Sequence, residues 1–313
     1  MTELGENTTT DEVLEGLDLK GTRYVVTGAS TGLGEETVRA VAAQGAAVTM
    51  AVRDIGRGRA AARRIRETVP DAELEVRELE LASLASVRTF AEKLLNEHSS
   101  IDVLINNAGV MACPEDKTVD GFELQMGTNH LGHFLLGVLL APALVAGAPA
   151  RLVSVSSRGH RFSDVDLEDP WFERTPYDPW ISYGRSKTAN VLFAVGFDAR
   201  FAGQGVRAFA LHPGGIVTEL GRHLTEETIG VLRSSLPAGE QPHWKTVPQG
   251  AATSVWAATS TDLDGKGGIY LEDCGIAEPT ADPSALSGVR AYAIDPESAD
   301  RLWAWSEHQV GLA

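Results

Sequence analysis

Short apolar segments alternate with segments of helical spacing at least five times along this chain. The expected strands are residues 23–27, 47–52, 74–79, 101–105, 151–156 and 206–211, and the expected helices are residues 35–44, 56–68, 83–97, 122–145 and 183–200. Apolar strands of this kind must be covered on both faces, and strands joined through helices run parallel with right-handed crossovers. The order predicts an α/β fold with a doubly wound parallel β-sheet flanked by helices.

No proline- or serine-rich linker and no internal repeat divides the 313 residues. An apolar content of 43% and a charged content of 22% are ordinary for a globular protein. We therefore expect a single domain at residues 20–275, which contains an insert at 158–182 and a substrate loop at 219–246. Residues 1–19 are expected to form an N-terminal tail and residues 276–313 a C-terminal extension.

The formal net charge of −16 restricts the partners that the chain can bind. A surface for nucleic acid or an anionic membrane needs surplus lysine and arginine, so we expect neither partner. Residues 1–20 are polar and acidic, unlike a signal peptide, and the glycines and prolines of segment 134–150 favour a buried helix over a membrane span. Cys113 and Cys274 are too few for a disulfide framework, so we expect a cytoplasmic protein.

The first expected strand leads into a glycine-rich turn, Gly28-Ala-Ser-Thr-Gly32-Leu-Gly34, and then directly into a helix. Gly28 permits a sharp turn, Gly32 lets the backbone approach a pyrophosphate, and Gly34 lets the helix pack closely on the strand. The free N–H groups at the start of the helix would face the anion. Glycine-rich turns are common, but this strand-and-helix context indicates a dinucleotide site. Its other expected members are Ser30, Thr31 and Leu33.

Tyr183 and Lys187 lie four residues apart and therefore on one face of the expected helix 183–200. The preceding strand ends in Ser156-Ser157, so these side chains reach the carboxyl edge of the sheet, where α/β folds bind ligands. A nearby ammonium lowers the pKa of a tyrosine hydroxyl and makes it a better acid/base. One serine would donate a hydrogen bond to the substrate oxygen. The pattern predicts an acid/base site in which Tyr183 protonates a substrate oxygen.

These segments, and others in the right order, resemble the classical short-chain dehydrogenase/reductase family from about Lys20 to about Tyr270. The resemblance implies a single-domain Rossmann fold and hydride transfer between a nicotinamide cofactor and a carbonyl or alcohol carbon. It also implies that Ser157 is the catalytic serine and that Asn129 is a fourth catalytic residue, which organises a water between the lysine and solvent.

Near Asn129, the pair His130 and His133 resembles two metal ligands, because the residues are three positions apart. With no third ligand in view, we expect no metal site here, and none at His212.

The second expected strand ends in Val52-Arg53-Asp54. An acid at the end of this strand would bind the adenosine ribose and repel a 2′-phosphate, but Val52 occupies that place. Arg53 can hold a phosphate with two parallel N–H bonds. In the family this pattern usually accompanies NADP(H), which is the expected cofactor. An ion pair between Arg53 and Asp54 is the alternative, and NAD(H) would then be possible.

The resemblance assigns three further segments to the cofactor. Glu80-Leu81 would meet the adenine, Asn107-Ala108-Gly109 would run along the adenosine, and Pro213, Gly214, Ile216 and Thr218 would lie beside the nicotinamide amide and the phosphates. A structural role for Asn107 and a plain turn at Pro213-Gly214 are the alternatives.

Within the family, residues 129–136, the insert and residues 187–193 resemble the retinol-dehydrogenase-like and protochlorophyllide-reductase-like branch. The insert includes His160 and Trp180, and with the loop 219–246 it predicts a pocket for a lipophilic carbonyl or alcohol. A packed surface flap is the alternative. Family analogy also predicts a homodimer or homotetramer through a helix bundle.

Three other functions share parts of this pattern. A redox sensor would hold NADP(H) without turnover, but the intact Ser157, Tyr183 and Lys187 favour catalysis. An NAD-dependent alcohol dehydrogenase would differ from the expected NADP(H)-dependent enzyme only in its cofactor. A sugar-nucleotide epimerase or dehydratase usually has a longer substrate domain after the sixth strand than this chain offers.

Overall fold

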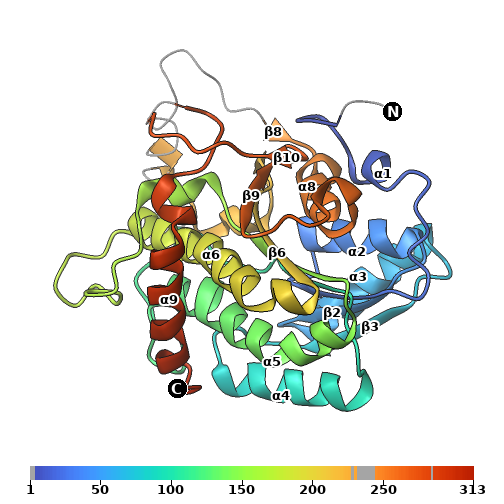
Figure 1. Cartoon of the computed structure of the whole chain (residues 1–313), viewed down its shortest axis with the longest axis horizontal. Helices are drawn as coiled ribbons and strands as arrows, with labels where there is room; N and C mark the ends of the chain where they lie inside the picture. Colours follow the sequence, from blue (N-terminus) through green and yellow to red (C-terminus); the bar gives the residue numbers. More distant parts are fainter. Residues whose placement is uncertain (1–3, 227–228, 231–243, 283–284) are drawn as a thin grey trace.

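A sheet of eight strands forms the centre of the computed structural model, which describes residues 4–226, 229–230, 244–282 and 285–313 (Figure 1). Its strands are β1 (Arg23–Thr27), β2 (Ala47–Val52), β3 (Leu74–Glu78), β4 (Val103–Asn106), β5 (Ala150–Val155), β6 (Val206–His212), β9 (Ile269–Glu272) and β10 (Gly275–Ile276). They follow the order β10-β9-β6-β5-β4-β1-β2-β3, and all pairs are parallel except β10 with β9. The predicted α/β fold with a mostly parallel sheet is confirmed.

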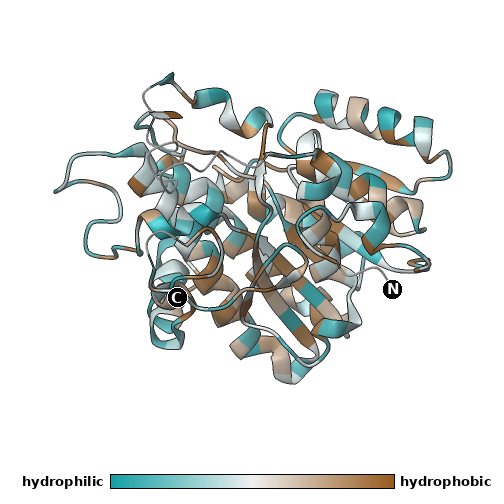
Figure 2. Ribbon diagram, turned by 90° about the horizontal axis from the view of Figure 1, so that it is seen from above, coloured by the Kyte–Doolittle hydropathy of each residue, from teal (hydrophilic) through white to brown (hydrophobic). Residues whose placement is uncertain are grey.

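Helices cover both faces of this sheet (Figure 1). One face carries α2 (Gly32–Ala43), α3 (Ile55–Thr68) and α8 (Val247–Thr259), and the other carries α4 (Leu84–Glu97), α5 (Gly132–Ala146) and α6 (Pro179–Phe201). Because successive strand residues point to opposite faces, Leu104 lies in one apolar core and Ile105 in the other. Figure 2 shows these hydrophobic residues along the sheet, with polar residues mainly on the outer helices and loops.

The sheet reverses its winding direction at β1, which pairs with β2 on one side and β4 on the other. In doubly wound sheets a ligand binds outside the carboxyl ends of the strands at such a point. The segments after β1 and β4 are the glycine-rich turn and residues 107–109. The topology therefore brings together two segments that the sequence assigns to the cofactor.

The long apolar helix expected at residues 122–145 begins with a π-helical segment, η1 (Met126–Leu131), that continues into α5. By length and composition, Met126–Ala146 could cross a membrane, but 72% of its most apolar window is buried inside the protein. It is thus the core helix that the sequence predicts. The π-helical turn contains Asn129.

The C-terminal helix α9 (Pro296–Gln309) packs against α6 (Figure 1). Its Trp303 makes edge contacts with Phe134 of α5 and lies stacked on Phe193 of α6. Part of the apolar surface of α5 and α6, on which the expectation of an intersubunit helix bundle rests, is therefore buried within the chain.

The N-terminal segment before β1 also packs on the domain. It contains a short helix, α1 (Thr10–Val13), which is capped by Thr9 and lies against α8. Leu14 is fully buried, and Asp11 forms an ion pair with Arg39 of α2. The segment expected as a tail thus contributes to the core on the α2 side.

Candidate active site

The glycine-rich turn is tightly packed against the end of β4. Gly28 has a φ of +67°, and a Cβ there would lie 2.9 Å from the Cα of Ala108. A Cβ on Gly34 would lie 2.4 Å from the carbonyl oxygen of Gly28. Gly32 has a φ of +57° and faces the side chain of Thr218. Glycine is needed at all three positions, and the turn meets both Ala108 and Thr218, as a common cofactor site requires.

The start of α2 leaves its N–H groups without a side-chain cap. Its N-cap residue, Thr31, makes no capping hydrogen bond. Six other α-helices that begin from a loop each have a side-chain cap: α1 by Thr9, α3 by Asp54, α4 by Ser83, α6 by Asp178, α8 by Thr246 and α9 by Asp295. The first N–H groups of a helix lack intrahelical partners, so the start of α2 fits the pyrophosphate of a dinucleotide.

The side chain of Asn107 has a structural partner. Its Nδ2 donates to the carbonyl oxygen of Thr27 at 2.8 Å, while the backbone N–H groups of Asn107 and Ala108 donate to Thr27 Oγ1 at 2.9 and 3.0 Å. Thr27 therefore holds the end of β4 against the glycine-rich turn. This residue was missed from the sequence because its partners lie about 80 residues away.

Several cations surround the expected adenosine end of the site. Arg53 is 68% exposed, and its nearest ion-pair partner is Glu80, with Nε 3.9 Å from Oε2. Asp54 instead caps α3 by accepting from the N–H of Arg57. Arg64 of α3 reaches the carbonyl oxygen of Ser30 in the glycine-rich turn at 3.4 Å. Arg57 and Arg64 lie on the basic helix that follows Arg53, where Arg57 pairs with Glu219 and Arg64 with Glu35.

Glu80 and Leu81 close this end of the site from the third strand. The Glu80 side chain accepts from the N–H of Ala82 at 3.0 Å, and Leu81 is buried against Gly132. The carboxylate of Glu80 is thus held by the local backbone.

Ser157 and Tyr183 lie side by side at the carboxyl end of β5. The Ser157 hydroxyl accepts from the N–H of Gly159 at 2.9 Å, and both this hydroxyl and the Tyr183 ring lie against the backbone of Gly159. Burial raises the pKa of Tyr183 to about 12, and the Ser157 hydroxyl opposes this rise. Tyr183 therefore needs a nearby positive charge before it can titrate near neutral pH.

Lys187 supplies such a charge from the same face of α6. Its Nζ donates to the carbonyl oxygen of Val155 at 2.9 Å and lies 5.7 Å from the centre of the Tyr183 ring. Burial lowers the pKa of Lys187 to about 8. The Ser156 hydroxyl does not face the tyrosine but donates to the carbonyl oxygen of Lys187 at 2.8 Å. Ser156 thus holds α6, whereas Ser157 faces Tyr183.

Asn129 is fully engaged by protein groups. Its Oδ1 accepts from the N–H of Val110 at 2.8 Å, and its Nδ2 donates to the Val110 carbonyl oxygen and to Ser186 Oγ. Its amide oxygen and Lys187 Nζ both lie near Gly109, 3.1 and 3.6 Å from where a Cβ of that residue would be. The structure therefore brings Asn129 and Gly109 to Lys187.

The family model for short chain dehydrogenases matches residues 23–229 of this chain. The chain belongs to the short-chain dehydrogenase/reductase family. A short-chain dehydrogenase/reductase named prx1, from Penicillium roqueforti, is 42% identical over 301 residues, which is 95% of this chain and 87% of that protein. Human retinol dehydrogenase 12 is 40% identical over 296 residues, or 95% of this chain and 88% of that protein.

A solved structure of an uncharacterized protein from Mycobacterium paratuberculosis has 37% identity and a TM-score of 0.73. The alignment covers 96% of this chain and 97% of that one. The predicted family and fold are thereby confirmed. As a member of this family, the enzyme is an oxidoreductase that acts on CH–OH groups with NAD(P).

The segment expected to bind the nicotinamide follows β6. Pro213 and Gly214 follow this strand, and a Cβ on Gly214 would lie 2.7 Å from the Lys245 side chain. Ile216 belongs to a short strand, β7 (Gly215–Ile216), that pairs with β8 (Trp244–Lys245). Ile216 and Leu33 both lie against Gly250 at the start of α8, so the last cofactor segment meets the glycine-rich turn.

The two expected substrate residues have different surroundings. Trp180 lies in an apolar cluster with Ala112 and Tyr183. His160 is fully buried on the other side of Ser157, where its Nε2 accepts from the N–H of Arg290 at 3.2 Å. Its Nδ1 is 2.8 Å from the carbonyl oxygen of Ser157. The structure thus places Trp180 against the tyrosine and packs His160 behind the serine. Of the predicted substrate loop, residues 227–228 and 231–243 lie outside the described residues.

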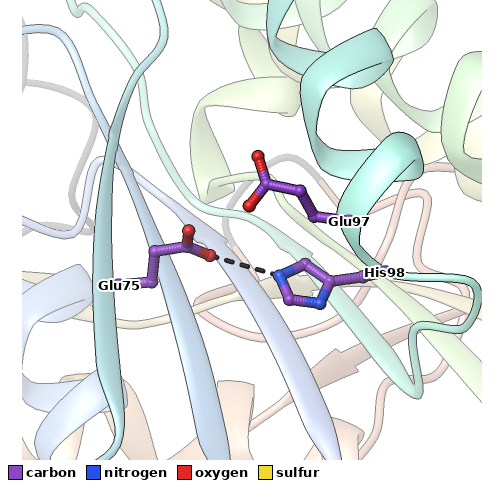
Figure 3. Close-up of side chains that lie close together, drawn as sticks. All are labelled: Glu75, Glu97 and His98. Carbon is purple, nitrogen blue, oxygen red and sulfur yellow. Dashed lines mark hydrogen bonds and ion pairs between the residues drawn. The ribbon is translucent and has the colours of Figure 1, made fainter.

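One cluster outside this site brings together three possible metal ligands, Glu75 of β3 with Glu97 and His98 at the end of α4 (Figure 3). Arg77 lies among them and forms ion pairs with both glutamates. His98 Nε2 is 3.4 Å from Glu75. Because the guanidinium already balances the two carboxylates, we assign the cluster a structural role, joining α4 to the edge strand of the sheet.

Proposed function

We propose that the enzyme transfers hydride between NADP(H) and the carbonyl or alcohol carbon of a lipophilic small molecule. The observation that carries this proposal is the arrangement of Ser157, Tyr183 and Lys187 at the carboxyl edge of the sheet. Gly159 donates to the Ser157 hydroxyl and lies against the Tyr183 ring, and Val155 accepts from Lys187 Nζ, so contacts within the protein alone place these side chains. Such preorganised donors and proton carriers are what carbonyl reduction needs.

Each side chain has a distinct task in this reaction. When bound, the nicotinamide supplies or accepts the hydride. In reduction, Tyr183 gives its hydroxyl proton to the substrate oxygen, and Ser157 donates a hydrogen bond to the same oxygen. The Lys187 ammonium stabilises the tyrosinate that remains. In oxidation, Tyr183 takes the proton from the alcohol, and the same ammonium lowers the tyrosine pKa from the high value that burial imposes.

The charges at the adenosine end favour NADP(H). Arg53 is largely exposed, and its Nε lies a loose 3.9 Å from Glu80 Oε2, so its guanidinium is available to a 2′-phosphate. Arg64 reaches the glycine-rich turn at Ser30 from α3. No acidic residue stands at position 52, where it would repel the phosphate. Guanidinium groups hold a phosphate by parallel, charge-assisted hydrogen bonds.

The surroundings of Tyr183 favour a lipophilic substrate. Ala112 and Trp180 are buried beside its ring, and Met111, Phe162 and Leu224 pack against this cluster. The indole Nε1 of Trp180 is buried with no hydrogen-bond partner among the described residues. We assign this donor to a second oxygen of the substrate, because a buried donor without a partner is costly. The substrate is then an apolar molecule with an acceptor group near the reacting carbon.

The experiment that tests this function combines binding with turnover. Purified enzyme is titrated with NADPH and NADH by fluorescence and then assayed with lipophilic aldehydes and ketones. We expect tighter binding of NADPH and turnover that Tyr183→Phe lowers by about 10²- to 10⁴-fold without weakening NADPH binding. Binding without any turnover would favour a redox sensor, and a preference for NADH would favour an NAD-dependent alcohol dehydrogenase. A Tyr183→Phe variant with wild-type turnover would sink the mechanism.

The sequence also predicts a cytoplasmic location and a homodimer or homotetramer, and both stay proposals. Because Trp303 of α9 packs on Phe134 and Phe193, any subunit interface at α5 and α6 would have to include α9. Sedimentation of the purified enzyme measures the oligomeric state directly.

A further inference from the structure

His130 and His133, which the sequence presents as a pair, have separate tasks in the structure. Both side chains are completely buried in the segment that runs from η1 into α5. His130 Nε2 is 2.8 Å from Ser306 Oγ, so it faces the C-terminal helix α9. His133 faces the opposite way, toward the catalytic and cofactor-binding segments. Its Nδ1 is 2.9 Å from the carbonyl oxygen of Asn129, and its Nε2 is 2.9 Å from Thr27 Oγ1.

The partners of His133 fix where its proton lies. The carbonyl oxygen of Asn129 can only accept a hydrogen bond, so Nδ1 must carry the hydrogen. Burial lowers the pKa of His133 to about 4, so the ring is neutral and Nε2 is an acceptor. Thr27 must therefore donate its hydroxyl hydrogen to Nε2. The other possible acceptor of this hydrogen, the carbonyl oxygen of Ile105, is 3.5 Å away.

Thr27 carries this chain of hydrogen bonds to the cofactor side. With its hydrogen directed at His133, Thr27 Oγ1 offers its lone pairs to the N–H groups of Asn107 and Ala108. Ala108 lies directly beneath Gly28 of the glycine-rich turn. The hydrogen bond from Thr27 to His133 therefore orients the group that positions the floor of the expected dinucleotide site.

Asn129 carries the chain to the catalytic side. Its side chain donates to Ser186 Oγ at 3.0 Å, and Ser186 Oγ donates to the carbonyl oxygen of Tyr183 at 2.8 Å. Both bonds are buried, and both end on the helix that carries Tyr183 and Lys187. The backbone of Asn129 is held at its carbonyl oxygen by His133.

We propose that His133 is a positioning residue, which couples the cofactor-binding segments to the catalytic helix through Thr27 on one side and Asn129 on the other. This inference rests on the proposed function, because it assigns His133 to the same reaction. The Thr27 side supports cofactor affinity, and the Asn129 side supports the rate of the chemical step. The two contributions are separable because each uses a different ring nitrogen.

Two substitutions separate the two nitrogens. In His133→Asn, the amide Nδ2 replaces the ring Nδ1 as donor to Asn129, and the contact with Thr27 is lost. In His133→Gln, the longer amide replaces Nε2 as acceptor for Thr27, and the contact with Asn129 is lost. Because one buried hydrogen bond changes an equilibrium or a rate by about tenfold, we expect a specific pattern. His133→Asn should weaken NADPH binding about tenfold and keep kcat, whereas His133→Gln should lower kcat about tenfold and keep the NADPH Kd.

The matched controls are His130→Asn and His130→Gln, which change an equally buried histidine that faces α9. They should lower the Tm without changing the NADPH Kd or kcat at a temperature where each variant is folded. If a His133 variant does not fold, Thr27→Val tests the cofactor side, and the expected result is again a weaker NADPH Kd. Equal NADPH Kd and kcat in wild type and both His133 variants would overturn the proposal. The proposal would also be overturned if the His130 variants lost NADPH affinity or kcat to the same extent as the His133 variants.

Failure of the proposed function gives a different result from failure of this inference. If the wild-type enzyme binds NADPH but reduces no carbonyl compound, the proposed function fails, and the NADPH Kd of His133→Asn still tests the cofactor side. If wild type turns over substrate and the two His133 variants match it, only the coupling through His133 fails.

Discussion

The backbone of Gly159 lies directly against the ring of Tyr183. A Cβ on Gly159 would be 2.6 Å from Tyr183 Cε1 and 3.3 Å from Ser157 Oγ. Gly159 also donates its N–H to Ser157 Oγ, so one residue without a side chain sets the position of both proposed catalytic hydroxyls. The short 3-10 helix η2 (Arg158–Phe162) that contains Gly159 is thus part of the candidate active site.

This contact predicts that Gly159→Ala shifts the Tyr183 ring. A methyl group inserted at a packed contact costs about 1–3 kcal/mol, and here the tyrosine ring must move to accept it. We expect kcat to fall about 10- to 100-fold while the NADPH Kd changes less than twofold. Gly203→Ala is the control, because nothing lies within 4 Å of the position where its Cβ would be. Wild-type kcat in Gly159→Ala would show that the ring is not held by this contact.

Arg53→Ala is expected to weaken NADPH binding selectively. Loss of charge-assisted hydrogen bonds to the 2′-phosphate should raise the NADPH Kd by about 10- to 100-fold. The NADH Kd, measured by the same fluorescence titration, should stay unchanged because NADH has no 2′-phosphate. An equal loss for both cofactors would contradict a phosphate contact and indicate a general electrostatic effect.

Lys187→Met is expected to separate stability from activity. The ammonium is buried, burial lowers its pKa to about 8, and it donates a hydrogen bond to the carbonyl oxygen of Val155. Since burying this charge opposes folding, an apolar side chain of similar length should raise the free energy of unfolding by about 1–3 kcal/mol at pH 7. Turnover should be lost. Thermal unfolding and a carbonyl-reduction assay test both parts, and a lower Tm would contradict the first.

Buried histidines are expected to make the enzyme sensitive to mild acid. Burial lowers the pKa of His130 to about 3, that of His133 and His160 to about 4, and that of His212 well below its usual range. In the unfolded chain each titrates near 6.5. The unfolded chain therefore binds more protons than the folded one, and stability falls as the pH drops from about 6.5 toward 4.

The size of this pH dependence follows from the number of protons that the chain takes up on unfolding. Near pH 5, unfolding should take up roughly three to four protons at the histidines, so the free energy of unfolding should fall by about 4–5 kcal/mol per pH unit. Burial raises the pKa of Glu123 and Glu272, which offsets part of this slope. Urea midpoints at pH 7.5 and 5.5 measure it. Equal midpoints would mean that these histidines are accessible to protons in the folded enzyme.

Local patterns predicted much of this molecule correctly. The strand that precedes Gly28 and the helix that follows it are readable because both lie within a few residues of the turn. The contact between Tyr183 and Lys187 follows from the spacing of one helix. These features need no knowledge of distant parts of the chain.

Features that depend on distant segments were not predictable in the same way. The hydrogen bond from Thr27 to His133 joins residues 106 positions apart, and neither residue type indicates that the other is its partner. Gly159 has no side chain whose chemistry could mark it. His160 belongs to the insert expected to line the substrate pocket, yet its ring lies among residues of the C-terminal segment, where Arg290 donates to it. Periodicity describes one element at a time, whereas these contacts depend on how elements pack.

The packing of α9 on α6 also has a consequence for how the chain is made. Synthesis proceeds from the N-terminus, so Phe134 and Phe193 leave the ribosome well before Trp303. Until α9 has been synthesised, the apolar surface of α5 and α6 that α9 covers stays exposed on the nascent chain. A stop codon before residue 296 would therefore release a chain prone to aggregate, although Ser157, Tyr183 and Lys187 are already present.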